Sequence, residues 1–288
     1  MNTQHIAIIA DSGTDPGISF IQAHDIRIIP LRINYTDGSS YRSMVDISSA
    51  EVIQSFEKEI PTTSLPSPDA IQKTLEQARA DGYQKAIIVT ISSGLSSTNQ
   101  TVGLIARDYA DFPVTVLDTK NIGLGAGLIV RAAALLAEKG IAYEDIIQKC
   151  TQLIENTRLW FSTKTLSYLR KGGRISEATY RLGSILNIKP VITCTPKGKY
   201  APVKKARGFQ KALQEEVNFV ARYSQKFSSV IVGICSSNSQ ECARELERAI
   251  RERLTNIAQV IHTQAPPELL VHTGPDLVGM CVQPNIFE

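Results

Sequence analysis

Short apolar runs alternate with helical patterns through the first half of this chain, and this alternation narrows the possible folds more than any other feature. Runs typical of buried strands occur at HIAIIADSG, IRIIPLRINY, KAIIVTISS and PVTVLDT. Helical spacing lies between them, as in SPDAIQKTLEQARADG, where Ser67 is an expected N-cap, Pro68 begins the helix and Gly82 follows its end. Strands that alternate with helices form parallel sheets covered on both faces. We therefore expect an N-terminal α/β domain over residues 1–156.

The pattern changes after Asn156, where strand-like runs follow one another more closely. These runs are LWFST, KPVITCTPKGKYAPVKKAR, SSVIVGICSS, IAQVIHTQ, LLVHTGP and VGMCVQP. PKGK between two such runs predicts a hairpin, and helices are expected at 209–223 and 240–254. Residues 157–288 thus predict a second α/β domain with a smaller, mixed or antiparallel sheet and helices. A ligand site is expected between the two domains.

Composition excludes several classes of protein. No run reaches the eighteen or so apolar residues of a membrane helix, since Arg131 interrupts IGLGAGLIVRAAALLA. The N-terminal run IAIIA lacks a preceding basic segment, so no signal peptide is expected. Five cysteines without a CxxC pair predict neither a metal site nor a disulfide framework. We expect a cytoplasmic protein without a metal or other cofactor.

Positive charge is concentrated in one segment. Residues 158–207 contain twelve Lys or Arg against a single acid, Glu177, although the whole chain has a net charge of only +3. A solvated face explains such a segment, and so does a surface for an anionic partner, phosphate or nucleic acid. Nucleic acid is the less favoured partner because few aromatic residues are interleaved for base stacking.

Two familiar motifs fail in this chain. In AIIVTISSGLSSTNQ, residues 86–100, Gly94 and Ser96 fit a nucleophile elbow, but Thr98 stands where the second glycine belongs. GLGAG, residues 123–127, resembles a dinucleotide-binding fingerprint, but Leu128 replaces its third glycine. What remains after the strand is a cluster of hydroxyl donors beside a helix start.

A second hydroxyl loop, PTTSLPSP at residues 61–68, contains Thr62, Thr63 and Ser64 before prolines that favour an extended backbone. Hydroxyls and the free N–H groups of a helix N-terminus together suit an anion. Helix capping explains each loop taken alone. The two loops predict a binding site only if the fold brings them together.

These segments, taken in order, resemble the DegV family of fatty-acid-binding proteins that serve bacterial fatty acid kinase. The resemblance spans almost the whole chain. It rests on IAIIADSGTD, TSLPSP, ISSGLSSTNQT, LDTKNIGLGAGL, TLSYLRKGGRIS, LNIKPVI, KKARG and HTGP. No single motif is decisive, but their shared order over 288 residues is specific.

The resemblance implies a two-domain α/β protein that encloses a long-chain fatty acid in a tunnel between its domains. Thr63, Ser93 and His272 then bind the carboxylate, and Arg170 lies at the entrance facing the partner. Thr62, Ser64, Gly94 and Ser96 belong to the supporting loops. His272 either donates one N–H while neutral or acts as a protonated counter-ion.

By the same resemblance the chain is a carrier rather than an enzyme. A separate ATP-dependent kinase subunit makes the acyl-phosphate for phospholipid synthesis, the basic segment docks on that kinase, and contact with a membrane surface is transient. The residues leave two alternatives open. One is a serine-dependent acyl hydrolase or transferase that uses Ser93 or Ser96, and the other is a sensor of acyl chains that acts through a protein partner.

Overall fold

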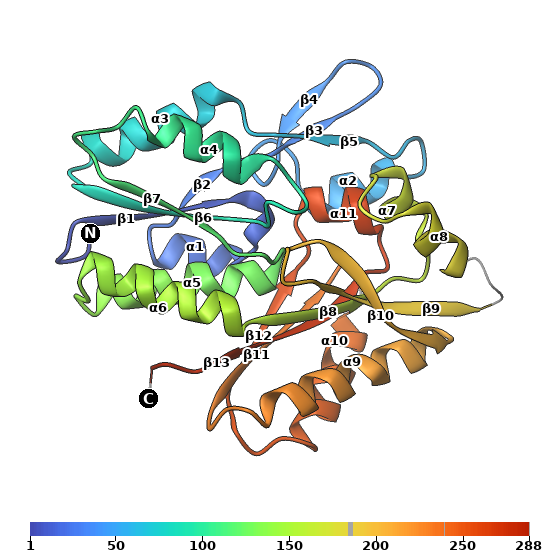
Figure 1. Ribbon diagram of the computed structural model, residues 1–288. Helices are drawn as coiled ribbons and strands as arrows, with labels where there is room; N and C mark the ends of the chain where they lie inside the picture. The colour runs from blue at the N-terminus through green and yellow to red at the C-terminus, as the bar shows by residue number, and fades with distance from the viewer. Residues whose placement is uncertain (184–186, 239, 288) are drawn as a thin grey trace.

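A four-stranded parallel sheet forms the centre of the N-terminal half in the computed structural model, which describes residues 1–183, 187–238 and 240–287 (Figure 1). The strand order is β2-β1-β6-β7, and all three pairings are parallel. The strands are β1 (Ile6–Asp11), β2 (Arg27–Ile29), β6 (Lys85–Thr90) and β7 (Val114–Asp118). Leu186 of the LNIKPVI motif and the last residue, Glu288, lie outside the described residues.

Helices cover both faces of this sheet, as expected. One face packs on α3 (Pro68–Ala80) and α4 (Thr98–Ala106), and the other packs on α1 (Ile18–Ala23), α5 (Leu124–Glu138) and α6 (Tyr143–Asn156) (Figure 1). Along β1, Ile6 and Ile8 enter one core while Ala7 and Ile9 enter the other. Successive strand residues point to opposite faces, so a strand buried on both faces has no polar alternation.

A six-stranded mixed sheet forms the C-terminal half, in the order β10-β9-β8-β13-β11-β12. β11 and β12 pair in parallel, and the other neighbours are antiparallel. The mixed pairing is as expected, but this sheet has more strands than the N-terminal sheet, so its expected smaller size was wrong. The strands are β8 (Arg158–Ser162), β9 (Ile188–Cys194), β10 (Tyr200–Arg207), β11 (Val230–Ser236), β12 (Ile257–Gln264) and β13 (Val278–Pro284).

Two helices, α9 (Phe209–Ser224) and α10 (Gln240–Arg251), cover one face of the mixed sheet (Figure 1). Its other face packs toward the N-terminal half, where Leu124 and Leu128 of α5 share one apolar core with Phe161 and Ile192. α6 ends at Asn156 and β8 begins at Arg158, so the mixed sheet starts where the sequence pattern changes. The shared core joins the halves closely, and the division into 1–156 and 157–288 stays a prediction.

A small antiparallel sheet, β4-β3-β5, lies beside the junction of the halves. It consists of β3 (Arg32–Asn34), β4 (Ser40–Arg42) and β5 (Thr62–Ser64), and α2 (Ser49–Ser55) lies between β4 and β5 in the chain. IRIIPLRINY was expected to form one strand, but it is split between β2 and β3, which belong to different sheets. Pro30 stands at the break, because its ring removes the N–H that a continuous ladder needs.

Three short helices complete the junction: α7 (Ser167–Lys171), α8 (Glu177–Gly183) and α11 (Pro267–Thr273). The prediction of a strand at LLVHTGP was wrong, since this run forms most of α11. Leu269, Leu270 and Val271 are all buried in this helix. The sequence therefore has a continuous apolar run there, which is also typical of a buried strand. In the described part of the chain, no helix has both the length and the apolar character needed to cross a bilayer.

Candidate functional site

A cavity of about 460 Å³ lies where the two halves and the small sheet meet. Its polar lining comes from β5, from the loop after β6, from Arg174 and from α11. Its apolar lining includes Leu31, Leu65, Ile91, Leu95, Ile122 and Leu269. An apolar pocket with a few polar groups is the usual form of a small-molecule site.

Thr63 and His272 meet in this cavity from opposite halves of the chain. Thr63 Oγ1 lies 2.9 Å from His272 Nε2. Alternation along β5 points Thr62 and Ser64 away from Thr63. Ser64 still lines the cavity at its edge and accepts a hydrogen bond from Asn34, whereas Thr62 is exposed and does not line it.

The environment of His272 favours its neutral form. Burial lowers the pKa of the imidazole from 6.5 to about 3, with a smaller contribution from the positive charge of Arg174. Of the two alternatives that the sequence left open, the neutral ring is therefore favoured over the protonated counter-ion. Its Nδ1 is buried without a hydrogen-bond partner among the described residues.

Gly172 packs directly against this ring. A Cβ atom on Gly172 would lie 2.1 Å from His272 Nδ1. Any larger residue at position 172 would therefore displace the imidazole.

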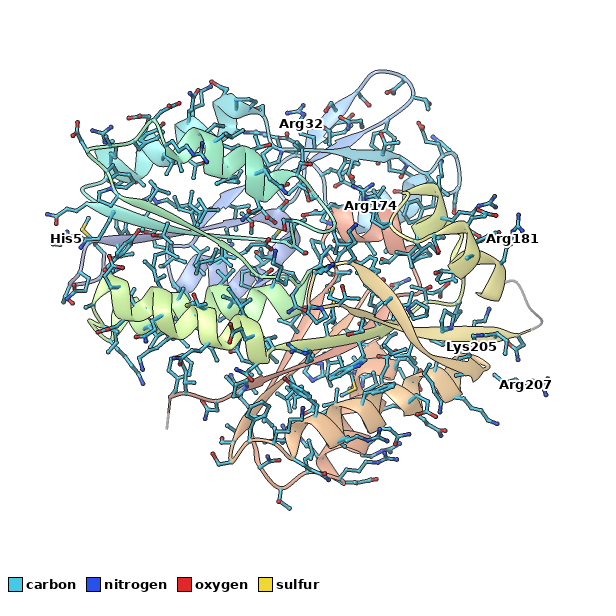
Figure 2. The ribbon with its side chains drawn as sticks, viewed as in Figure 1. His5, Arg32, Arg174, Arg181, Lys205 and Arg207 are labelled. Carbon is cyan, nitrogen blue, oxygen red and sulfur yellow. The ribbon has the colours of Figure 1, made fainter. Side chains whose placement is uncertain are left out.

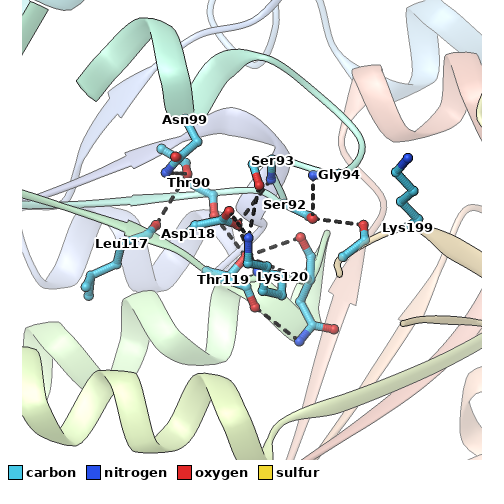
Figure 3. A network of polar contacts seen from close by, with 12 residues as sticks. Thr90, Ser92, Ser93, Gly94, Asn99, Leu117, Asp118, Thr119, Lys120 and Lys199 are labelled. Atoms are coloured by element: carbon cyan, nitrogen blue, oxygen red, sulfur yellow. Dashed lines mark hydrogen bonds and ion pairs between the residues drawn. The ribbon is translucent and has the colours of Figure 1, made fainter. Parts of the chain in front are cut away.

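The hydroxyls after β6 have different roles (Figure 3). Ser92 Oγ donates to the Gly198 carbonyl over 2.8 Å and accepts from the Gly94 amide over 3.0 Å, so it ties the loop to the β9–β10 turn. Ser96 Oγ bonds to the Thr98 hydroxyl and accepts from the Thr98 amide at the start of α4. Ser93 lines the cavity, where its hydroxyl can reach a ligand.

The arginine that reaches the cavity is Arg174 and not Arg170. Arg174 lines the cavity and donates through Nε to the Leu95 carbonyl over 3.3 Å. Arg170 lies outside it, half exposed, with Nε 3.0 Å from Glu177 and its guanidinium 4.3 Å from the centre of the Tyr180 ring. LRKGGR offers both arginines, and the sequence alone does not say which side each one faces.

Sequence reasoning also missed Glu268, an almost fully buried acid in the cavity wall. Burial raises the pKa of its carboxyl, although hydrogen bonds from Ser12 and Ser43 lower it in part. Burial likewise raises the pKa of Asp11 and Asp15 to about 8. Burial thus favours the neutral form of each of these three acids.

A nucleophilic serine requires a base to accept its proton, and within the described residues His272 makes no hydrogen bond to a serine. His272 bonds to Thr63, and Ser96 bonds to Thr98. Beside Ser93 stands Asp118, an ion-paired carboxylate. No group of three potential metal ligands from His, Cys, Asp and Glu occurs within the described ranges.

Comparison with known proteins matches nearly the whole chain to one protein family. A family model described as "Uncharacterised protein, DegV family" matches residues 5–285. A DegV domain-containing protein of Clostridium perfringens is 33% identical over 283 residues, which cover 98% of this chain and all of that protein.

Two solved structures share the fold. One, described as showing fatty acid binding of a DegV family protein from Thermus thermophilus, is 27% identical with a TM-score of 0.90 and covers 99% of this chain and 100% of its own. The other, a stearic acid-binding protein from Eubacterium ventriosum, is 25% identical with a TM-score of 0.85 and covers 97% and 98%. The two-domain α/β fold expected from the sequence is therefore confirmed.

Proposed function

We propose that this chain, which belongs to the DegV family, binds a long-chain fatty acid in the cavity and presents its carboxylate to a separate ATP-dependent kinase. The observation that carries the proposal is the meeting of Thr63 and His272 at 2.9 Å in a cavity that Ser93 and several apolar side chains also line. Relatives described as fatty-acid-binding proteins support it.

The apolar wall suits the hydrocarbon tail. A sixteen-carbon acid that buries about fourteen methylenes gains roughly 11 kcal/mol at ~0.8 kcal/mol each, before the cost of ordering the chain. Such a gain is sufficient for tight binding without a covalent bond. Leu31, Ile91 and Leu269 supply apolar surface in the same cavity as Thr63, Ser93 and His272.

The polar residues suit an ionised head group. A buried carboxylate is unfavourable unless it accepts hydrogen bonds or faces a positive charge. Once a carboxylate replaces the bond between Thr63 and His272, the hydroxyls of Thr63 and Ser93 and one N–H of a neutral His272 are three donors to it, and Arg174 adds a cation in the same cavity. Hydrogen bonds to the charged form keep the acid ionised.

In this proposal the chain is a carrier, and the kinase performs the phosphoryl transfer that leads to phospholipid synthesis in the cytoplasm. The carboxylate must be uncovered for that step. Gly172 and Gly173 follow α7, and Gly173 has a φ of 71°, which glycine adopts without strain. Movement at this pair would shift Arg170 outside the cavity together with Arg174 in its wall, and so open the cavity.

The docking surface proposed for the kinase is basic. Arg181 on α8 and Lys205 and Arg207 on the edge strand β10 project from the same side of the molecule (Figure 2). An acidic kinase surface would bind here with a strong salt dependence, and a membrane surface would make transient contact in the same way. A salt titration of the complex that shows no weakening would contradict this docking surface.

Mass spectrometry of the purified chain tests the proposed function. We expect an added mass equal to a fatty acid under native conditions and the bare chain mass after denaturation. Loss of that added mass in a Thr63→Val variant, with retention in the distant Lys73→Ala variant, would assign it to the cavity. An acyl mass that survives denaturation on Ser93 or Ser96 would instead support a serine-dependent hydrolase or transferase.

A further inference from the structure

Lys120 has an unusual backbone conformation directly after β7. Its φ of 53° lies in the left-handed region, which costs a residue with a side chain about 1–2 kcal/mol. Glycine or asparagine would adopt this turn more readily. The reason that a lysine occupies this strained position therefore lies in its side-chain contacts.

The ammonium group of Lys120 connects two loops (Figure 3). Its Nζ donates to Asp118 Oδ2 over 2.5 Å and to Ser93 Oγ over 3.0 Å. Asp118 Oδ1 in turn accepts the backbone N–H groups of Ser93 and Lys120, each over 3.1 Å. The three residues form a closed set of contacts that fixes the position of Ser93.

The surroundings of Asp118 favour its ionised form beside Lys120. Burial raises the pKa of Asp118, but hydrogen bonds from Lys120 and Ser93 outweigh this effect and leave the pKa below its usual value. The side chain of Asp118 is 17% exposed and that of Lys120 is 40% exposed. The contact is thus sheltered in part from the screening that weakens surface pairs.

This contact determines what the Ser93 hydroxyl offers to a ligand. A serine hydroxyl has one proton and two lone pairs, and an ammonium group can only donate. Once Ser93 Oγ accepts from Lys120, its proton is directed elsewhere, toward Asp118 or toward the cavity that Ser93 lines. Lys120 itself does not line the cavity, so it acts on a ligand through Ser93.

We propose that Lys120 is a positioning residue that fixes Ser93 as a hydrogen-bond donor and so makes the cavity select ionised carboxylates over neutral head groups. The inference rests on the proposed function. A carboxylate accepts a charge-assisted bond from Ser93, whereas an alcohol accepts only a weaker, neutral bond. The ammonium also polarises the hydroxyl and strengthens the bond that it donates.

The test compares palmitate with hexadecanol as competitors of a fluorescent fatty acid. Lys120→Met should weaken palmitate binding about tenfold and hexadecanol binding far less, because the bond to a charged acceptor gains most from the ammonium. Lys120→Arg should retain the preference for palmitate. Lys120→Gly, which relieves the backbone conformation, should show the same selective loss as Lys120→Met.

A double-mutant cycle tests whether Lys120 acts through Ser93. On a Ser93→Ala background, Lys120→Met should cause no further loss of palmitate affinity. An equal loss for both ligands would reveal a merely structural role, and unchanged palmitate affinity would show no role; either result overturns the inference while the proposed function stands. Failure of the wild-type chain to bind palmitate would overturn both.

Discussion

At the scale of single residues, the account depends on a neutral histidine held against a threonine. Thr63 Oγ1 lies 2.9 Å from His272 Nε2, and Gly172, which has no side chain, leaves space for the imidazole ring. The ring and the hydroxyl together offer hydrogen bonds to a carboxylate without adding a buried charge.

Removal of one partner should weaken ligand binding. Thr63→Val keeps the shape of the side chain but deletes its hydroxyl, so it leaves a buried polar group unsatisfied at a cost of about 1–3 kcal/mol, or roughly 5–150-fold in affinity for palmitate. Thr62→Val, whose side chain does not line the cavity, is the matched control. Equal affinities measured by isothermal titration for the two variants would contradict the assigned role.

Stability at low pH should also report on His272. The pKa of the ring is lowered from 6.5 to about 3 in the folded chain. Above pH 6.5 the ring is neutral in both states. As the pH falls below 6.5, the unfolded state takes up a proton that the folded state does not, so stability falls by up to about 1.4 kcal/mol per pH unit.

His272→Gln lacks this titration. Between pH 8 and pH 5 the difference in the free energy of unfolding should therefore move in favour of the variant. Urea denaturation of both proteins at each pH measures it, and the buried acids Asp11 and Asp15 cancel because both proteins contain them. Parallel pH profiles would show that His272 titrates normally in the folded chain.

At the scale of elements, helices and strands with a distinct spacing of apolar and polar residues are predicted from the sequence. The prediction fails where an element is so deeply buried that this spacing is lost. α3 begins after Ser67 with Pro68 at its first position, as its capping residues indicate. α11 was missed because a helix buried all round and a strand buried on both faces have the same apolar run. The division between β2 and β3 was missed although Pro30 stands at the break.

In the candidate site, too, some residues were expected from the sequence and others were not. Thr63, Ser93 and His272 line one cavity, and their grouping was expected only from the family resemblance. Arg174 and Glu268 escaped notice because their orientation is set by tertiary packing, which no local spacing records. The turn between Gly172 and Arg174 decides which arginine of LRKGGR faces inward.

A pair of glycine variants tests the contact between the loop after β6 and the β9–β10 turn. A Cβ atom on Gly94 would lie 2.6 Å from the Lys197 carbonyl, whereas one on Gly103 in α4 would meet nothing within 4 Å. Gly94→Ala should therefore lower the free energy of unfolding by about 1–3 kcal/mol. Gly103→Ala should raise it by about 0.4–1 kcal/mol. Chemical denaturation that gives both variants the same sign would contradict the close packing at Gly94.

At the scale of the whole molecule, one apolar core and one cavity connect the two halves. Leu124 and Leu128 of the first half share a core with Ile192 and Leu269 of the second. A ligand in the cavity contacts residues of both halves, so its binding energy stabilises the chain as a unit.

We therefore expect a single unfolding transition that palmitate shifts as a whole. At a free concentration one hundred times Kd, the ligand should add about 2.7 kcal/mol to the free energy of unfolding. Differential scanning calorimetry with and without palmitate measures the shift. Two transitions, of which the ligand moves only one, would contradict the coupling of the halves.

A crystal structure of the chain with bound palmitate tests the central claim most directly. The account predicts a carboxylate within hydrogen-bond distance of Thr63 Oγ1, Ser93 Oγ and the His272 ring, with the tail against Leu31, Ile91 and Leu269. A carboxylate bound away from these three residues, or an acyl ester on a serine, would contradict it.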